Sequence, residues 1–276
     1  MSAVLHTPWQ PLSVAQTLDA ALRLFRAALL RCLPYGVLTV IAAHLPYLYN
    51  LVGGFAARPF ISRPAGWWAL NILGALLQTI LWNATLLRLE AVAAGRRAGM
   101  GEELSAALRR APAVLLLILV LLLASALLTL PALLLPALVR PMGFVVAGIA
   151  VAYLWVRLSC SWPAVVLHNK GVLPSLTWSI QLVRGNCLRV AAVYCVGVVM
   201  LIVLAALGAV LVGVIVPLVA RDDIALITSI SVDVVVALGA VFVPFCSALS
   251  FKLFEELRAC QPDSGLDPRP AGAALD

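Results

Sequence analysis

The sequence predicts an all-α membrane protein, a bundle of six transmembrane helices. Of its 276 residues, 63% are hydrophobic and 11% are charged, and the mean hydropathy is +1.07. A soluble domain carries about 25% charged residues and about 45–50% apolar ones, and could not bury so much apolar surface. The apolar residues also form long runs almost free of charge. Each run supplies the roughly 20 residues that a helix needs to cross a bilayer.

Six such runs give six predicted spans. The fourth contains only Arg157, near its end, the sixth contains only Asp233, and the other four contain no charged residue. Prolines inside the spans remove backbone donors, so we expect kinked helices. The predicted spans are residues 32–57, 64–87, 111–139, 141–167, 190–220 and 224–251.

The apolar runs continue almost to the end of the chain, which indicates one membrane domain and no separate soluble module. We assign this domain to residues 12–260, after a short segment of residues 1–11. The tail, residues 261–276, is rich in Pro, Gly and Ala with charges of both signs. That composition is typical of a disordered segment, so we expect a disordered cytoplasmic tail.

Basic residues are unevenly distributed between the two ends of the predicted spans. Four lie on one side, at positions 58, 63, 140 and 221, and the other fifteen lie on the side of both termini. The positive-inside rule places the second side in the cytoplasm. The net charge of +7 is thereby explained by topology, and without a nucleic-acid-reading motif we predict no nucleic-acid partner. The fifteen are Arg23, Arg26, Arg31, Arg88, Arg96, Arg97, Arg109, Arg110, Arg157, Lys170, Arg184, Arg189, Lys252, Arg258 and Arg269.

A short amphipathic helix is predicted before the first span. Ser13 and Gln16 have the spacing of a capping box. Apolar residues then recur at helical spacing, with Asp19 and Arg23 four residues apart on another face. Pro34 is expected to end this helix and to separate it from the first transmembrane helix.

Similar segments precede the third and fifth spans, so the chain resembles three repeats of an interfacial helix and a transmembrane hairpin. The second copy starts at Glu102 and is expected to break at Pro112; the third starts at Pro174 and ends at Gly185. The aligned cores are Ala21-Leu22-Arg23, Ala107-Leu108-Arg109 and Ser179-Ile180-Gln181. Such helices either form a collar that binds lipids or a partner, or simply anchor the bundle. The arginines expected to face lipid headgroups are Arg23, Arg26, Arg109, Arg110 and Arg184.

Catalytic motifs are missing from the sequence. The histidines do not form H-E-x-x-H, only one acidic residue lies within a span, and neither a P-loop nor G-x-S-x-G occurs. The six cysteines form no C-x-x-C pair and no metal-ligand spacing. We therefore predict a protein that is not an enzyme and that has no cofactor and no metal site.

Asp233 is the candidate intramembrane polar site. A charge at a helix centre costs about 2.5–3.5 kcal/mol on insertion scales, so such a residue usually faces the protein interior. Its candidate polar partners are His44, Gln78, Asn83 and Arg157. Either Asp233 senses protons or substrate in a small transporter, or it is a protonated or hydrogen-bonded packing residue.

Three short segments resemble a bacterial family of inner-membrane proteins. This family includes the YciC-type proteins and the membrane domain attached to some glycerophosphoryl diester phosphodiesterases. The resemblance implies a six-span bacterial inner-membrane bundle whose role concerns the envelope or its lipids. It implies no phosphodiesterase activity, which in that family belongs to a separate soluble barrel. The segments are Leu12-Ser13 with Leu18-Asp19 and Arg23-Leu24-x-Arg26, Ser179-x-Gln181-Leu182-Val183-Arg184-Gly185-Asn186, and Phe254-x-Glu256-Leu257-Arg258. Ala15 replaces a usual glycine and Phe254 a frequent tyrosine.

Two functional hypotheses follow. The first is a scaffold or interaction protein of the envelope, with membrane lipids and envelope proteins as partners. The alternative is a small transporter or channel for a lipid-like or organic solute, with Asp233 in its pathway.

The topology is directly testable with reporter fusions. A reporter in the connection at residues 95–101 will be active on the cytoplasmic face, and one in the connection at residues 58–63 on the opposite face. If both report the same face, the six-span topology is wrong.

Overall fold

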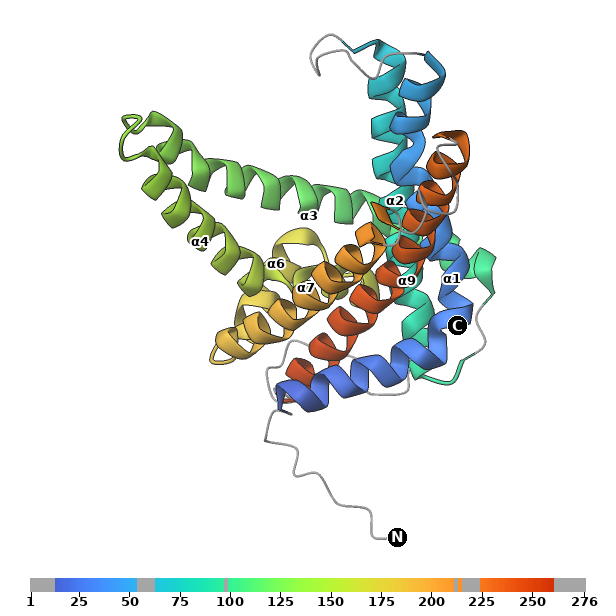
Figure 1. The fold of residues 1–276 in the computed structure, drawn as a ribbon. Coiled ribbons are helices and arrows are strands. Elements are labelled where there is room, and N and C mark those ends of the chain that lie inside the picture. Colours follow the sequence, from blue (N-terminus) through green and yellow to red (C-terminus); the bar gives the residue numbers. More distant parts are fainter. Residues whose placement is uncertain (1–12, 54–62, 97–98, 211–212, 215–223, 261–276) are drawn as a thin grey trace.

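All regular elements in the described part of the chain are helices. A computed structural model describes residues 13–53, 63–96, 99–210, 213–214 and 224–260; at residues 50, 51, 53, 201, 224–233 and 235–237 it describes the backbone alone. The predicted segments 1–11 and 261–276 lie outside the described residues. The helices are α1 (Val14–Gly53), α2 (Ala65–Ala93), α3 (Met100–Leu134), α4 (Arg140–Leu158), α5 (Ser161–His168), α6 (Val172–Val183), α7 (Cys187–Val210) and α9 (Ile224–Ala259) (Figure 1).

Six helical stretches of the described chain are long and apolar enough to cross a membrane, which confirms the all-helical class and the predicted number of spans. They agree in order with the apolar runs of the sequence, because each run supplies about 20 mainly apolar residues. The stretches are Val14–Tyr49, Ala65–Ala93, Met100–Leu134, Arg140–His168, Cys187–Val210 and Leu238–Ala259.

The fourth stretch consists of two helices, α4 and α5, joined by a turn at Ser159 and Cys160. The Ser159 hydroxyl donates to the Val156 carbonyl at 2.9 Å, and the Ser161 hydroxyl donates to the Leu158 carbonyl. Serine hydroxyls that bond to nearby backbone carbonyls compete with the helical ladder, which explains the interruption.

The predicted breaks at Pro34 and Pro112 are wrong. Pro34 lies inside α1 and Pro112 inside α3, and both helices continue past the proline. A proline removes one backbone donor and bends the helix, but bonds on either side hold the helix together. Figure 1 shows that α1 changes direction along its length. Pro174 is also not the first residue of its helix, because α6 begins at Val172.

The predicted helix ends are confirmed at two places. At the start of α1, the Ser13 N–H donates to Gln16 Oε1 at 2.8 Å, and the Gln16 N–H donates to Ser13 Oγ at 3.3 Å. This is the reciprocal pairing of a capping box. After α6, Gly185 has a φ of 84°, a left-handed conformation that glycine adopts without a steric penalty.

Helix α1 packs side by side with α2 and α9, and the α3–α4 hairpin diverges from the α1–α2 hairpin (Figure 1). The packing of α1 is unusually close. A methyl group at Gly36 would lie 2.3 Å from the Ala240 carbonyl oxygen of α9, and one at Gly74 of α2 would lie 2.6 Å from the Ala42 carbonyl oxygen. Glycines at these points let the helix backbones touch.

Two glycines of the fifth span meet side chains of α9 rather than its backbone. Gly197 faces the side chain of Leu249 and Gly208 that of Leu238, both from α9, and Gly213 has no neighbour within 4 Å. These contacts are with side chains, which can shift, so they constrain the helix spacing less than the contact at Gly36 does.

The buried core lies where α1, α2, α5, α6 and α9 meet, and includes Tyr35, Phe251 and Phe254. By contrast, α3, α4 and α7 expose long apolar faces, with Leu127 70% exposed, Val145 63% and Ile202 60%. Faces this apolar match a hydrocarbon solvent, in which apolar side chains need no burial.

We expect Gly36→Ala to destabilise the protein, because the new methyl group must push α1 away from the Ala240 backbone. Overpacking of this kind costs about 1–3 kcal/mol. The measurement is the midpoint of thermal unfolding of the purified protein in detergent. Gly148→Ala in α4 is the control: it meets nothing within 4 Å, and alanine stabilises a helix by up to about 1 kcal/mol over glycine. An unchanged midpoint for Gly36→Ala would show that the two helices are not in tight contact.

Candidate functional site

A cavity of about 780 Å³ lies between the helices of the second to fifth spans, and α9 of the sixth span contributes Ser250 to its wall. Ligand sites in proteins have volumes of about 300–1,000 Å³, so it is large enough for a small molecule or part of a lipid. Its walls are mostly apolar and aromatic. They consist of Ala75, Gln78, Thr79, Trp82, Asn83, Val114, Leu117, Ile118, Leu121, Ala152, Trp155, Val156, Leu158, Ser159, Ser161, Trp162, Tyr194, Val198 and Ser250.

The cavity reaches the surface of the molecule on its α4 and α7 sides. Trp155 of α4 and Val198 of α7 both line it, and they are 47% and 52% exposed. These residues lie in the apolar stretches that are long enough to cross a membrane. A molecule dissolved among lipid tails could therefore enter from the side, without passing through water.

Tryptophans form one wall of the cavity. The rings of Trp82 and Trp162 meet edge to face, with centroids 5.9 Å apart. The Trp162 indole N–H donates to Asn83 Oδ1 at 3.0 Å, and the Trp155 indole N–H donates to the Ser125 hydroxyl at 3.1 Å. The indole N–H groups of Trp162 and Trp155 thus both have hydrogen-bond partners, which hold the two rings in fixed orientations.

Asn83 is fully buried, and its amide has a settled orientation. Because an indole nitrogen can only donate, the atom that Trp162 contacts must be the amide oxygen, and the amide nitrogen must point elsewhere. Among the described residues this nitrogen, Nδ2, has no hydrogen-bond partner. Leaving a buried donor unpaired costs about 1–3 kcal/mol, which makes Asn83 the most unusual polar group in the cavity wall.

None of the described residues that line the cavity carries a charge. The other polar groups are amides and hydroxyls, including Gln78, Thr79 and Tyr194, whose hydroxyl lies 3.5 Å from that of Ser250. Such a site can accept or donate hydrogen bonds, but it offers no counter-charge and no nucleophile paired with a base.

Next to the cavity helices, a buried cluster joins α1, α2 and α3. Arg88 Nε lies 2.8 Å from Glu103 Oε2, and the Tyr35 hydroxyl donates to the same oxygen at 2.6 Å. The Arg88 and Glu103 side chains are only 13% and 4% exposed. Removing one partner from such a pair leaves an uncompensated buried charge, so the pair ties the three helices together.

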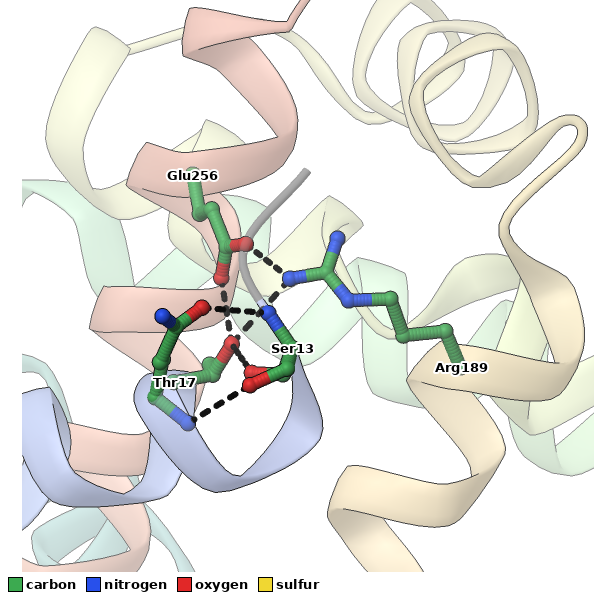
Figure 2. Close-up of polar contacts among 5 residues, drawn as sticks. Ser13, Thr17, Arg189 and Glu256 are labelled. Atoms are coloured by element: carbon green, nitrogen blue, oxygen red, sulfur yellow. Dashed lines mark hydrogen bonds and ion pairs between the residues drawn. The ribbon is translucent and has the colours of Figure 1, made fainter. Parts of the chain in front are cut away.

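A second cluster joins the start of α1 to α7 and α9 (Figure 2). Arg189 and Glu256 form an ion pair, Glu256 accepts a hydrogen bond from the Thr17 hydroxyl at 2.6 Å, and Arg189 Nη2 donates to Thr17 Oγ1 at 3.1 Å. Ser13 lies one helical turn before Thr17 and caps the same helix. The first and last helices are thereby fixed to the fifth span.

The structure separates the predicted intramembrane polar residues. Gln78 and Asn83 line the cavity. His44 does not: its Nδ1–H donates to the Val40 carbonyl of its own helix at 2.8 Å, and its ring stands beside Tyr47. Arg157 lies against the Tyr153 ring, 5.6 Å from its centroid, and is not part of the cavity wall. The backbone at residue 233 belongs to α9, but the Asp233 side chain lies outside what the structure describes.

The arginines predicted to face headgroups differ among themselves. Arg23, Arg26, Arg109 and Arg184 are exposed, and Arg23 pairs with Asp19 as its spacing predicts. Arg110 is only partly exposed and donates a hydrogen bond to the Val166 carbonyl of α5. Contact of these residues with headgroups stays a prediction.

Sequence reasoning missed the two ion-pair clusters and the tryptophan wall. One signal was available: Glu103 lies on the same helix face as Ala107, Ala111 and Val114, all of which are apolar and buried. An acidic residue on an apolar face needs a buried partner. The identity of that partner could not be derived, because Arg88 and Tyr35 meet it only through the packing of three helices.

No protein-family model, curated protein or solved structure matches this chain. The resemblance to the bacterial inner-membrane family therefore stays a prediction. Two of its residues have structural roles here: Glu256 belongs to the second cluster, and the Ser179 hydroxyl donates to the Arg157 carbonyl at 2.9 Å, which joins α6 to α4.

We expect Glu103→Ala to destabilise the protein by about 3–5 kcal/mol, because it leaves Arg88 buried without a counter-charge. The double variant Arg88→Met/Glu103→Leu will recover most of that loss, since it removes both charges. The readout is chemical unfolding in mild detergent. As a control, Asp19→Ala breaks an exposed pair and will cost no more than about 0.5 kcal/mol. A Glu103→Ala protein as stable as Asp19→Ala would contradict the buried pairing.

Proposed function

We propose that this protein is a non-enzymatic integral membrane protein that takes up a lipid-like solute from the bilayer and carries it in the intramembrane cavity. The single observation behind the proposal is the cavity itself, which is apolar, large enough for a ligand and open through lipid-exposed helices. This is the transporter hypothesis drawn from the sequence, with the cavity as its binding site. The role of Asp233 in the pathway stays a prediction.

The bacterial inner membrane is the proposed location, with both termini in the cytoplasm. The fifteen-to-four distribution of basic residues supports this orientation, and the family resemblance supports the bacterial membrane. On this topology, Arg88 marks the cytoplasmic end of the second apolar run, residues 64–87, within α2. Asn83 lies five residues before it, or about 8 Å along the helix at 1.5 Å per residue, so the inner end of the cavity belongs to the cytoplasmic half of the membrane.

Three repeated units, each beginning with an interfacial amphipathic segment, are part of the same proposal; in the first two units this segment is continuous with the span. Burial supports the alignment: the small residue at the start of each aligned core is fully buried, and a buried polar residue stands four positions before it. In the first two units that polar residue belongs to an ion-pair cluster. The small residues are Ala21, Ala107 and Ser179, and the polar ones are Thr17, Glu103 and Ser175.

Interaction with an envelope partner is the second candidate function. The exposed side chains of Arg26 on α1 and of Arg109 on α3 favour it, because they present basic groups to anionic lipids or an acidic protein. Copurification of one protein partner, together with absence of solute movement, would favour this role.

Transport is tested with Ala152→Phe, which places a ring in the cavity wall of α4. In proteoliposomes that contain the wild-type protein, a fluorescent short-chain lipid will move between leaflets faster than in empty liposomes. Ala152→Phe will reduce this protein-dependent part of the rate at least about tenfold. The readout is the fraction of the label that a membrane-impermeant reductant reaches over time.

Val146→Phe is the matched control on the same helix, since Val146 is 68% exposed and is not part of the cavity wall. It will transport at the wild-type rate. A wild-type rate equal to that of empty liposomes, or equal loss in the two variants, would contradict the proposed function.

A further inference from the structure

We propose that a cluster of three hydroxyl groups in the cavity wall binds the headgroup of an uncharged lipid that carries a free hydroxyl. This inference rests on the proposed function and specifies its ligand. The cluster consists of Ser159, Tyr194 and Ser250, which belong to the α4–α5 turn, α7 and α9.

The first step concerns access from the cavity. All three residues line the cavity, and all three are partly exposed rather than buried. The Tyr194 hydroxyl lies 3.5 Å from that of Ser250, and the Ser159 hydroxyl is its second hydrogen-bonding neighbour. Three elements that are far apart in the sequence therefore bring their hydroxyl groups together in a part of the wall that a bound molecule can contact.

The second step concerns the direction of the hydrogen bonds. The Ser159 hydroxyl donates to the Val156 carbonyl at 2.9 Å, and the Tyr194 hydroxyl donates to Ser250. A hydroxyl group has one proton to donate but two lone pairs that accept, so the cluster retains more acceptors than donors. The ligand atom that completes it is therefore a donor. A lipid O–H supplies one, whereas an ether or ester oxygen does not.

The third step concerns the spacing of the cluster. O–H···O hydrogen bonds have oxygen–oxygen distances of about 2.5–3.0 Å, so the 3.5 Å between Tyr194 and Ser250 is a long contact. A ligand oxygen beside the pair can form a shorter bond to each hydroxyl than they form with each other. Bridging oxygens of this kind are nearly as favourable as a direct hydrogen bond.

The fourth step concerns the rest of the ligand. Val198 lies one helical turn from Tyr194 on α7, about 6 Å at 1.5 Å per residue, and is 52% exposed where the cavity reaches the surface. A ligand with its headgroup at Tyr194 can therefore extend a hydrocarbon chain past Val198 into the bilayer. None of the described wall residues carries a charge, so a phosphate or ammonium group in the cavity would lack a counter-charge there. The ligand that fits is an uncharged amphiphile.

The experiment measures equilibrium binding to the purified full chain in phosphatidylcholine nanodiscs, because this lipid has no hydroxyl group that could compete. The probes are an undecanol with bromine at the far end of its chain, the methyl ether of the same molecule, and the corresponding alkyl phosphate. Bromine quenches tryptophan fluorescence on contact, and three tryptophans of the cavity wall, Trp82, Trp155 and Trp162, serve as reporters. Quenching that persists in Ala152→Phe arises outside the cavity and is subtracted.

The wild-type protein will bind the alcohol at least about fivefold more tightly than the ether, which corresponds to about one net hydrogen bond. It will bind the phosphate at least about tenfold more weakly than the alcohol. The alcohol and the ether differ at one proton, so their ratio reports on the donor that the cluster is expected to receive.

Tyr194→Phe keeps the ring and removes its hydroxyl, so it will weaken binding of the alcohol by about fivefold and leave binding of the ether unchanged. Ser250→Ala will shift the ratio in the same direction. Tyr153→Phe is the matched control, since it makes the same change on α4 at a tyrosine that is 54% exposed and is not part of the cavity wall. It will keep the wild-type ratio.

Three results would overturn the proposal: equal binding of the alcohol and the ether by the wild-type protein, equal loss of both probes in Tyr194→Phe, or a phosphate bound as tightly as the alcohol. The second would mean that the hydroxyl only supports the structure. The wild-type comparison decides the ligand class even if Tyr194→Phe does not fold. If the alcohol and the ether quench equally and Ala152→Phe removes both signals, the cavity function stands and the hydroxyl cluster fails. If Ala152→Phe changes neither signal, the proposed function fails as well.

Discussion

The backbones of α1 and α9 approach each other closely at Gly36, and the arrangement of the polar interior depends on this approach. Inside a membrane, lipid tails are as apolar as side chains, so helices associate through tight packing and hydrogen bonds rather than through the hydrophobic effect. Gly36 supplies the tight packing. Its neighbour Tyr35 is thereby held in the core, where its hydroxyl reaches Glu103 of α3. A larger residue at position 36 would move this hydroxyl away from its partner.

The ion-pair clusters then determine which helices can move. Arg88 and Glu103 tie α2 to α3, and Arg189 and Glu256 tie α7 to α9, so buried charges cross-link these helices in two pairs. Each pair is stable only while both partners are present, because a single charge left in the core is costly. Away from these ion pairs, α3, α4 and α7 expose long apolar faces. On the proposed function, motion that admits a solute is expected at these faces, with the ion-paired helix segments as a fixed base.

The cavity lies between the fixed base and the exposed helices. The α4–α5 turn at Ser159 brings Trp162 back toward α2, where it meets Asn83 and Trp82. The hydrogen bond from the Trp162 indole to the Asn83 amide oxygen fixes the orientation of the Trp162 ring. It also fixes the direction in which the Asn83 amide nitrogen points. The described wall residues carry no charge, so the wall matches the uncharged, lipid-like solute of the proposed function.

The sequence by itself determined the helical class, the six apolar stretches and the capping box at Ser13, because these depend on composition and on residues close together in the chain. It also selected Gln78 and Asn83 as intramembrane polar residues, though as partners of Asp233 rather than as parts of a cavity wall. Only the tertiary structure decided that α1 and α3 continue past Pro34 and Pro112, since packing can stabilise a bent helix. Likewise, Arg88 with Glu103 and Asn83 with Trp162 are separated by 15 and 79 positions, so no local pattern could pair them. Their pairing follows from how close the helix backbones lie, a property of three-dimensional packing that the order of residues along one helix does not contain.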